Sequence, residues 1–497
     1  MMDKFSLMAV YPEIVLLVMA CVIALADLLD KGRRRMVAYT LSILTLLVLA
    51  ALSGYYAGLG RTIFGFGDMV VSDPMANWLK CFAALSLLIT FIYGRAYVTE
   101  RGMLRGGGEW YVLGLLALLG IYVIVSAHNF VLVYLGLECL TLASYALVAL
   151  RRDHVVSVEA AMKYFVLGAM ASGFLLYGMS MLYGATGTLD IAEVLKAIAS
   201  GKVDHQVLVF GVVFVVAGLA FKFGAAPFHM WIPDVYHGAP TAVTLMIGGA
   251  PKLAAFAMAI RLLVEGLLPL WSDWQQMLGL LAIASLLIGN LAAIAQTNLK
   301  RMLAYSTIAQ MGFVLLGLMA GVVSNNSLGA ANAYSSAMFY VVTYVLTTLA
   351  SFGVILLLAR EGFESEEIAD FSGLNQHSPL YAGIMSICLF SLAGLPPLVG
   401  FQAKLSVLQA LISTGQPSYI TLAVFAVMMS LIGAFYYLRV IKVMYFDDPV
   451  GAPAAISAPL DMRAVLSLNG ALLLILGIVP GALMTLCADA IVQMLAA

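Results

Sequence analysis

Apolar stretches of about 20 residues recur along almost the whole chain, and an α-helix needs a stretch of that length to cross a lipid bilayer. Of the 497 residues, 63% are hydrophobic and 10% are charged, whereas an ordinary soluble domain is about 25% charged. The stretches are too long and too unbroken for the strands of a membrane barrel, which alternate over about ten residues. The sequence therefore predicts an all-α polytopic membrane protein.

Counting such stretches gives about fourteen membrane-spanning helices. The first is too long for a signal-peptide core and no A-x-A pattern follows it, so we interpret it as a retained helix. The connections are short, and residues 1–497 are predicted to form one integral membrane domain. The expected helices cover residues 5–29, 36–58, 74–98, 110–127, 130–150, 157–184, 206–226, 240–262, 274–296, 302–322, 331–359, 379–414, 418–445 and 464–488.

Basic residues are divided unevenly between the two alternating sets of loops. Because cytoplasmic loops are enriched in Lys and Arg, the richer set is predicted to face the cytoplasm and both termini to lie on the outer face. The richer set holds fifteen: Lys31, Arg33, Arg34, Arg35, Arg95, Arg101, Arg105, Arg151, Arg152, Lys300, Arg301, Arg360, Arg439, Lys442 and Arg463. The other set holds five: Lys4, Arg61, Lys196, Lys202 and Arg261.

Two of the expected helices are interrupted in matching ways by Gly and Pro. The seventh ends in KFGAAP (222–227), and the twelfth contains GLPPLVG (394–400). Interrupted helices at corresponding places in two halves are typical of inverted-repeat transporters. We therefore expect helices 4–8 (about 110–262) and helices 9–13 (about 274–445) to form two inverted repeats.

One loop on the predicted outer face has a helical pattern of its own. The segment LDIAEVLKAIA (189–199) places apolar residues at helical spacing. Asp190 and Glu193 have the spacing of a capping box. A short interfacial helix is expected here, either as an ordinary connector or with a role in function.

Single charged residues lie deep inside four of the apolar stretches. A charge at bilayer depth costs at least about 2.5–3.5 kcal/mol, so such residues usually serve function. A desolvated lysine releases its proton readily, which predicts a polar path for protons. Glu13 and Asp27 are expected nearer the ends of the first helix, within reach of water. The four deep residues are Glu138, Lys222, Lys252 and Lys404.

Their arrangement suggests two relationships. Glu138 and Lys222 are natural partners, either as a pair that switches with protonation or as a static ion pair. Lys222 and Lys404 occupy the two broken helices, and we interpret them as counterparts in the two repeats.

Three further residues are candidates for a supporting role. Lys163 lies one or two turns inside the sixth helix and could take up protons or extend to the interface. His229 and His237, after the seventh helix, could relay protons near neutral pH or form interfacial hydrogen bonds. Lys80 is a weaker candidate. Without a C-x-x-C pattern or a mid-helix histidine pair, no iron–sulfur cluster, structural zinc or haem is expected in this chain.

A long run from the seventh into the eighth helix carries a family resemblance. It resembles the proton-antiporter signature of the membrane arm of respiratory NADH:quinone oxidoreductase, which Mrp-type cation/proton antiporter subunits share: FKFGAAPFHMWIPDVYHGAPTAVTLMIGGAPKLAAF (221–256). Further matches are LGLECLTLASYALVAL (135–150), QTNLKRMLAYSTIAQMG (296–312) and LAGLPPLVGFQAKL (392–405). Within the family the chain is most similar to the subunit N type. It ends after the fourteenth helix, without the long lateral helix of subunit L, and has Lys404 where subunit M has a glutamate.

The resemblance implies a function and a set of partners. Glu138, Lys222, Lys252 and Lys404 match the proton-carrying residues of the family, which form a hydrated axis in the middle of the membrane. NADH, FMN, iron–sulfur clusters and quinone are expected in partner subunits, with none of them bound by this chain. Expected neighbours are subunit M, small subunits such as K, and the lipids of a bacterial inner membrane. The net charge of −1 gives no indication of nucleic-acid binding.

Two other functions are considered. One is a subunit of an Mrp-type sodium/proton antiporter complex, which shares the signature but has no redox partner. The other is a silent scaffold of a membrane arm, which the deep charges disfavour.

Overall fold

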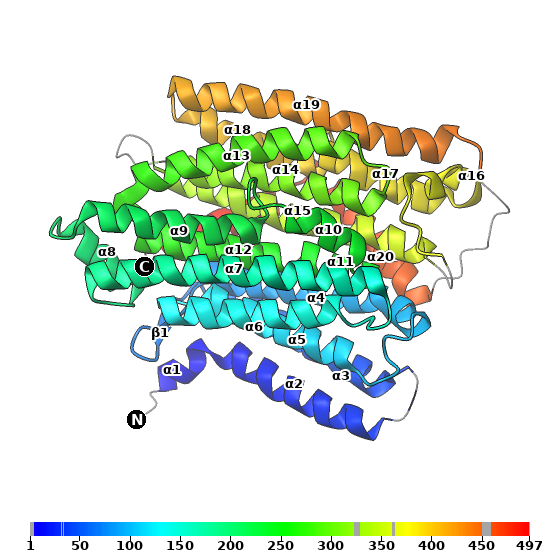
Figure 1. The fold of residues 1–497 in the computed structure, drawn as a ribbon, viewed down its shortest axis with the longest axis horizontal. Coiled ribbons are helices and arrows are strands. Elements are labelled where there is room, and N and C mark those ends of the chain that lie inside the picture. The colour runs from blue at the N-terminus through cyan, green and yellow to red at the C-terminus, as the bar shows by residue number, and fades with distance from the viewer. Residues whose placement is uncertain are drawn as a thin grey trace.

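The computed structural model describes residues 4–30, 32, 34–322, 329–359, 363–449 and 459–496. Its long helices lie side by side in one bundle (Figure 1). The first part comprises α1 (Lys4–Ala9), α2 (Tyr11–Leu29), α3 (Met36–Gly58), β1 (Ile63–Gly65), β2 (Val70–Ser72), α4 (Pro74–Glu100), α5 (Glu109–Ser126), α6 (Phe130–Val148), α7 (Val155–Thr186), α8 (Ile191–Ala199), α9 (His205–Phe223), α10 (Trp231–Gly238), α11 (Thr241–Gly248), α12 (Pro251–Ala259) and the π-helix η1 (Ile260–Gly266). The second part comprises η2 (Leu268–Leu270), α13 (Trp271–Ile294), α14 (Leu299–Met319), α15 (Ala330–Leu358), η3 (Ile368–Phe371), α16 (Leu374–His377), α17 (Pro379–Ala393), α18 (Val399–Ser413), α19 (Pro417–Phe446), α20 (Leu460–Ile478) and α21 (Gly481–Leu495).

The predicted all-α polytopic fold is confirmed. Within the described ranges, thirteen helices are long and apolar enough to cross a membrane. The broken pair α17 and α18, each 15 residues long, supplies a further crossing. The expected last helix, 464–488, was wrong in its bounds. The structure has α20 and α21 instead, and Pro480 between them lacks the N–H that would continue α20.

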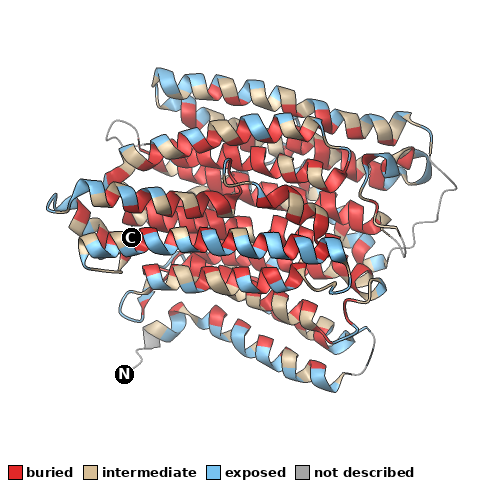
Figure 2. Ribbon diagram, in the orientation of Figure 1, coloured by how far each residue is buried: buried red, intermediate tan, exposed pale blue. Residues whose placement is uncertain are grey.

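Burial divides the bundle into inner and outer helices (Figure 2). The segments of α11–α12, α14 and α15 are almost entirely buried. By contrast α2, α3, α7 and α19 expose large apolar side chains, among them Leu25, Val48, Met162 and Leu431. Lipid or a neighbouring subunit covers such surfaces in a membrane. The central helices are therefore shielded from the bilayer by the outer ones.

Both predicted helix breaks are present. α9 and α17 each end at a glycine in the left-handed conformation, Gly224 with φ of 75° and Gly394 with φ of 84°, which a residue with a Cβ adopts only at a cost. A Cβ on Gly224 would also stand 1.8 Å from Ile232 Cδ1. A third break, which the sequence analysis did not predict, separates α11 from α12 at Gly249 and Ala250. The eighth membrane helix is thus also discontinuous.

The short helix expected at 189–199 is confirmed as α8, at the same end of the bundle as both termini (Figure 1). Asp190 caps it by accepting hydrogen bonds from the backbone N–H groups of Ala192 (3.0 Å) and Glu193 (3.1 Å). The Glu193 carboxylate pairs with Lys196 at 2.8 Å and does not close a capping box. Asn129, just before α6, forms a β-bridge with Asp190, so α6 starts at this end.

Arginine-rich loops lie at the opposite end, where α6 finishes. Arg101 and Arg151 both contact the Glu364 carboxylate at 3.0 Å. Burial raises the pKa of Glu364, but a hydrogen bond from Tyr97 and the charges of both arginines outweigh it and lower that pKa overall. Three basic residues assigned to these loops lie outside the described residues: Lys31, Arg33 and Arg360.

Two basic residues that the sequence analysis assigned to loops are buried inside the bundle. Lys300, in the first turn of α14, donates to the carbonyl of Ala239 (2.9 Å) and to Glu366 (2.8 Å). Arg261 is buried because the eighth helix continues past its expected end as η1. Its guanidinium pairs with Asp73 at 2.7 Å. Both assignments were wrong because hydropathy marks the end of an apolar run and gives no information on packing.

Candidate functional site

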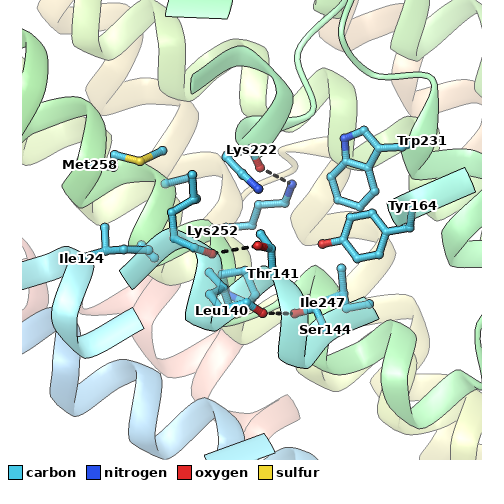
Figure 3. A pocket seen from close by; sticks show the side chains of 14 residues that line it. Ile124, Leu140, Thr141, Ser144, Tyr164, Lys222, Trp231, Ile247, Lys252 and Met258 are labelled. Atoms are coloured by element: carbon cyan, nitrogen blue, oxygen red, sulfur yellow. Dashed lines mark hydrogen bonds between the residues drawn. The ribbon is translucent and has the colours of Figure 1, made fainter. Parts of the chain in front are cut away.

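Lys252, in the first turn of α12, reaches the C-terminal end of α9 (Figure 3). Its Nζ donates to the backbone carbonyls of Phe223 (2.8 Å) and Lys222 (3.3 Å). It also stands 5.5 Å from the ring centroid of Trp231, within the range of a cation–π interaction. The last carbonyls of a helix have no partner within that helix. The early end of α9 therefore creates the acceptors that hold the buried ammonium.

A small cavity adjoins Lys252 and Lys222, with Thr141, Ser144 and Tyr164 in its wall (Figure 3). It offers about 20 Å³ to the centres of water molecules, and one water needs about 10–15 Å³. The hydroxyls of Thr141 and Ser144 donate to carbonyls one turn earlier in α6, at 2.9 and 2.7 Å. A hydroxyl oxygen has two lone pairs as well as its donor, so these side chains suit a hydrogen-bonded water beside the two lysines.

Lys222 and Glu138 are not joined by an ion pair in the described structure. The Lys222 Nζ is buried without a hydrogen-bond partner there, and so is the Glu138 Oε1. The Lys222 ammonium lies 5.4 Å from the ring centroid of Phe221. A direct static pair, one of the two arrangements considered above, is therefore absent. Buried polar atoms that lack protein partners are commonly satisfied by water.

Lys404, on α18, is buried against the end of α17. Its Nζ donates to the carbonyls of Leu392 (2.8 Å) and Ala393 (3.0 Å) and to the Ser430 hydroxyl of α19 (2.7 Å). The ammonium lies 5.2 Å from the ring centroid of Phe313. The last carbonyls of the second broken helix, α17, thus also accept hydrogen bonds from a buried lysine.

The hydrogen bonds of Lys404 match those of Lys252. Each ammonium binds the carbonyls of the two residues that precede the terminal glycine of a broken helix. Lys222 lies two residues before Gly224, and the same place in α17 is taken by Leu392. By these contacts Lys404 resembles Lys252 more than Lys222, the counterpart expected from the sequence.

The three supporting candidates lie outside the wall of the Lys252 cavity, as far as the structure describes it. Lys163 is exposed on α7 and contacts Glu159 and Asp234, both at 2.9 Å. His229 is half-buried between α9 and α10, and its Nδ1 has no hydrogen-bond partner among the described residues. His237 is half-buried in the last turn of α10.

Lys80 and Glu13 form a buried ion pair, although the sequence marked Lys80 only as a weaker candidate. Lys80 is fully buried and contacts Glu13 at 2.5 Å, and Ser126 donates to the same carboxylate at 3.1 Å. The expectation that water reaches Glu13 and Asp27 was wrong, because both are buried. Asp27 accepts the N–H of Gly108 at 2.6 Å. The sequence did hold a signal for the ion pair, because Glu13 and Lys80 each lie inside an apolar run.

The chemistry open to this set of side chains is proton exchange. The amines of Lys252 and Lys404 donate to neutral carbonyls at breaks in membrane helices, and no carboxylate contacts either ammonium in the described part of the chain. Such an ammonium can lose its proton without breaking an ion pair. No group of three or more His, Cys, Asp or Glu residues able to hold a metal ion was found among the residues described.

Comparison with known proteins agrees with this fold. Residues 127–430 match the family described as NADH:quinone oxidoreductase/Mrp antiporter, TM, so the chain is an antiporter-type membrane protein. A chain of respiratory complex I from Thermus thermophilus, solved with bound aureothin, is 31% identical. The match covers 96% of this chain and 99% of that one, with a TM-score of 0.78. A chain of the Mrp complex from Dietzia sp. DQ12-45-1b shares the fold, with a TM-score of 0.84 at 22% identity and coverage of 99% and 97%.

Curated relatives identify the branch. NADH-quinone oxidoreductase subunit N of Polaromonas naphthalenivorans (strain CJ2) is 70% identical over 99% of this chain and 98% of its own length. Subunit N of Herminiimonas arsenicoxydans is 60% identical over the full length of both chains. The chain therefore belongs to the subunit N family of NADH-quinone oxidoreductase, which confirms the resemblance found in the sequence.

Replacing Lys80 by Met is expected to destabilise the chain by about 3–5 kcal/mol, because Glu13 would remain as a buried charge without its partner. The amount of assembled complex in membranes, measured on native gels before and after mild heating, should fall. Adding Glu13→Gln should restore much of it. Lys196→Met is the control, because Lys196 is exposed and its loss should not change assembly. If Lys80→Met alone leaves assembly and heat resistance unchanged, the pair does not stabilise the fold.

Proposed function

We propose that this membrane subunit of NADH-quinone oxidoreductase moves protons through Glu138, Lys222, Lys252 and Lys404. The observation that carries the proposal is that a buried lysine donates to the last carbonyls of a broken helix in two places. Lys252 does so at the end of α9, and Lys404 does so at the end of α17. Lysine can act as a proton carrier, whereas arginine stays charged. Electron transfer from NADH to quinone takes place in partner subunits, which hold NADH, FMN, iron–sulfur clusters and quinone.

The first part of the path joins Glu138, Lys222 and Lys252. Lys222 and Lys252 line one cavity, and the cavity has room for water. The unpartnered atoms of Glu138 and Lys222 are the groups such water would bridge. Lys163, His229 and His237 are proposed as relays toward this cavity, with His229 favoured by its unpartnered Nδ1.

The setting of the chain in the complex is part of the proposal. Helices 4–8 (about 110–262) and 9–13 (about 274–445) are proposed to be the two inverted repeats. The exposed apolar side chains of α19, such as Leu431, suit contact with a neighbouring membrane subunit or lipid. Antiporter-like subunit M and small subunits such as K are the proposed neighbours. The arginine-rich end is proposed to face the cytoplasm of a bacterial cell, with both termini outside the inner membrane.

An Mrp-type sodium/proton antiporter subunit is the second candidate. The match to the Mrp chain, at 22% identity, supports a common fold and carries no further weight for function. The full-length relatives at 70% and 60% identity favour the redox-driven complex.

The test uses a double-mutant cycle on Glu138 and Lys222. Glu138→Gln and Lys222→Met should each slow proton pumping by inverted vesicles at matched assembly, because each removes a titratable group from the proposed water-bridged path. The double variant is expected to lose less than the sum of the two, since interacting residues are non-additive. Strict additivity would show that they do not interact, and wild-type pumping in both single variants would remove them from the path.

A further inference from the structure

We propose that Ser430 is the immediate proton acceptor for Lys404 and that Gln310 is the positioning residue of this site. The inference rests on the proposed role of Lys404 as a proton carrier and extends it to two residues on neighbouring helices. Ser430 lies on α19, and Gln310 lies on α14. Both are uncharged and gave no signal in the sequence.

The hydrogen bonds of Lys404 match the charged form of its side chain. An ammonium group has three N–H donors and no acceptor. Lys404 Nζ has three acceptors within 3.0 Å: the carbonyls of Leu392 and Ala393 and the Ser430 Oγ. The Ser430 hydroxyl in turn donates to the Ala393 carbonyl at 3.3 Å. Every donor of the charged state therefore has a partner.

The same heavy atoms also fit the uncharged form. A neutral amine has two N–H donors and one lone pair. The two donors can stay on the Leu392 and Ala393 carbonyls, and the lone pair can accept the Ser430 hydroxyl. The Lys404–Ser430 hydrogen bond reverses its direction, and the Ser430 hydroxyl proton leaves the Ala393 carbonyl, which keeps its hydrogen bond from Lys404. A hydroxyl both donates and accepts, so Ser430 fits both states without a change in packing, whereas a carbonyl at this place would fit only the charged one.

A cavity beside Ser430 gives the proton somewhere to go. It is a pocket open toward the exposed face of α19, beside Leu431, and it offers about 260 Å³ to water centres. Lys404 and Ser430 are the polar side chains in its otherwise apolar lining. In the proposed step, the Lys404 ammonium passes a proton to the Ser430 Oγ, and the original Ser430 hydroxyl proton passes to a water in the cavity. One N–H bond breaks, one O–H bond forms on Ser430, and its former proton joins the water. The net transfer is one proton from lysine to water.

Gln310 holds the carbonyl on which Lys404 rests. Its Nε2 donates to the Leu392 carbonyl at 2.9 Å and to the Tyr437 hydroxyl at 3.1 Å, and its Oε1 accepts from the Tyr340 hydroxyl. Leu392 is thus fixed from α14 in both protonation states. No ionised side chain of the described chain contacts Lys404, and Tyr340 and Tyr437 are the titratable groups behind it on α15 and α19.

The proposal is tested in inverted vesicles that contain the whole complex. NADH-driven quinone reduction and proton pumping are measured per assembled complex across a range of pH for Ser430→Ala, Ser430→Thr and Ser430→Cys. Removing a hydrogen-bonding proton acceptor should slow pumping about tenfold and change the pH profile. Threonine, which keeps the hydroxyl, should pump near the wild-type rate, and the weaker hydrogen-bonding thiol should lie between them. Gln310→Glu, which keeps the carbonyl oxygen, and Gln310→Leu should alter the pH profile with Ser430 intact.

Ser406→Ala is the matched control. Ser406 is buried, whereas Ser430 is half-buried. Ser406 lies two residues from Lys404 on α18 and donates to the Ala403 carbonyl at 2.9 Å, so its loss should leave pumping unchanged. If Ser430→Ala keeps wild-type pumping and a wild-type pH profile while Lys404→Ala is impaired, the proposed role of Ser430 is wrong and that of Lys404 stands. A fall in assembly with an unchanged pH profile would also overturn it, because that result marks a structural role. Normal pumping by Lys404→Ala would instead contradict the function proposed for Lys404 itself.

Discussion

Lys252→Ala should leave the complex assembled but slow quinone reduction and proton pumping by at least about tenfold, a modest share of what a positioned acid–base group contributes. Lys252 bridges the end of α9 to the water-sized cavity that Lys222 also lines. Without its amine, no titratable group at this position can exchange a proton with that cavity. Both rates are to be measured in inverted vesicles, at matched amounts of assembled complex.

Lys252→Gln separates the proton role from the structural one. The glutamine amide can still donate to the carbonyls of Phe223 and Lys222, but it carries no exchangeable charge. Alanine leaves those carbonyls without a donor, which costs about 1–3 kcal/mol for a buried group. We expect Gln to recover stability without recovering pumping. Wild-type pumping by Lys252→Gln would show that Lys252 only holds the end of α9.

The second large effect is expected at Lys404. Lys404→Ala should impair pumping strongly, and Lys404→Arg should impair it as well, because arginine stays protonated in proteins. The cavity beside Lys404, about 260 Å³, gives a longer side chain room, so a defect in the Arg variant would not be a simple clash. Proton pumping and assembly are measured as for Lys252. Normal pumping by Lys404→Arg would mean that Lys404 acts only as a fixed positive charge.

The sequence predicted the bundle and the breaks because those depend on local properties. Hydropathy over about 20 residues marks a membrane helix, and Gly with Pro in KFGAAP and GLPPLVG marks where α9 and α17 end. Hydropathy predicted one helix where the structure has α20 and α21, because Pro480 divides a single apolar run. It also missed the break at Gly249, since glycine is common in continuous membrane helices.

The free energy needed to place a charge in the bilayer was enough to select the deep lysines and Glu138 from the sequence. The groups that contact them could not be predicted in this way. Lys252 and Lys404 rest on carbonyls, which every residue has, so no pattern of side chains identifies them in advance. Glu138 and Lys222 looked like a pair because their charges are opposite, yet the fold leaves them without a direct contact.

What the sequence alone determined is which segments enter the membrane and which charges enter with them, because transfer free energy is a property of each segment. Tertiary structure decided which of those charges meet. Lys80 pairs with Glu13 and Arg261 with Asp73 across long separations in the chain. Lys404 meets Ser430 and shares the Leu392 carbonyl with Gln310. These contacts depend on how α4, α14, α17, α18 and α19 pack, because hydrogen bonds act only over about 3 Å.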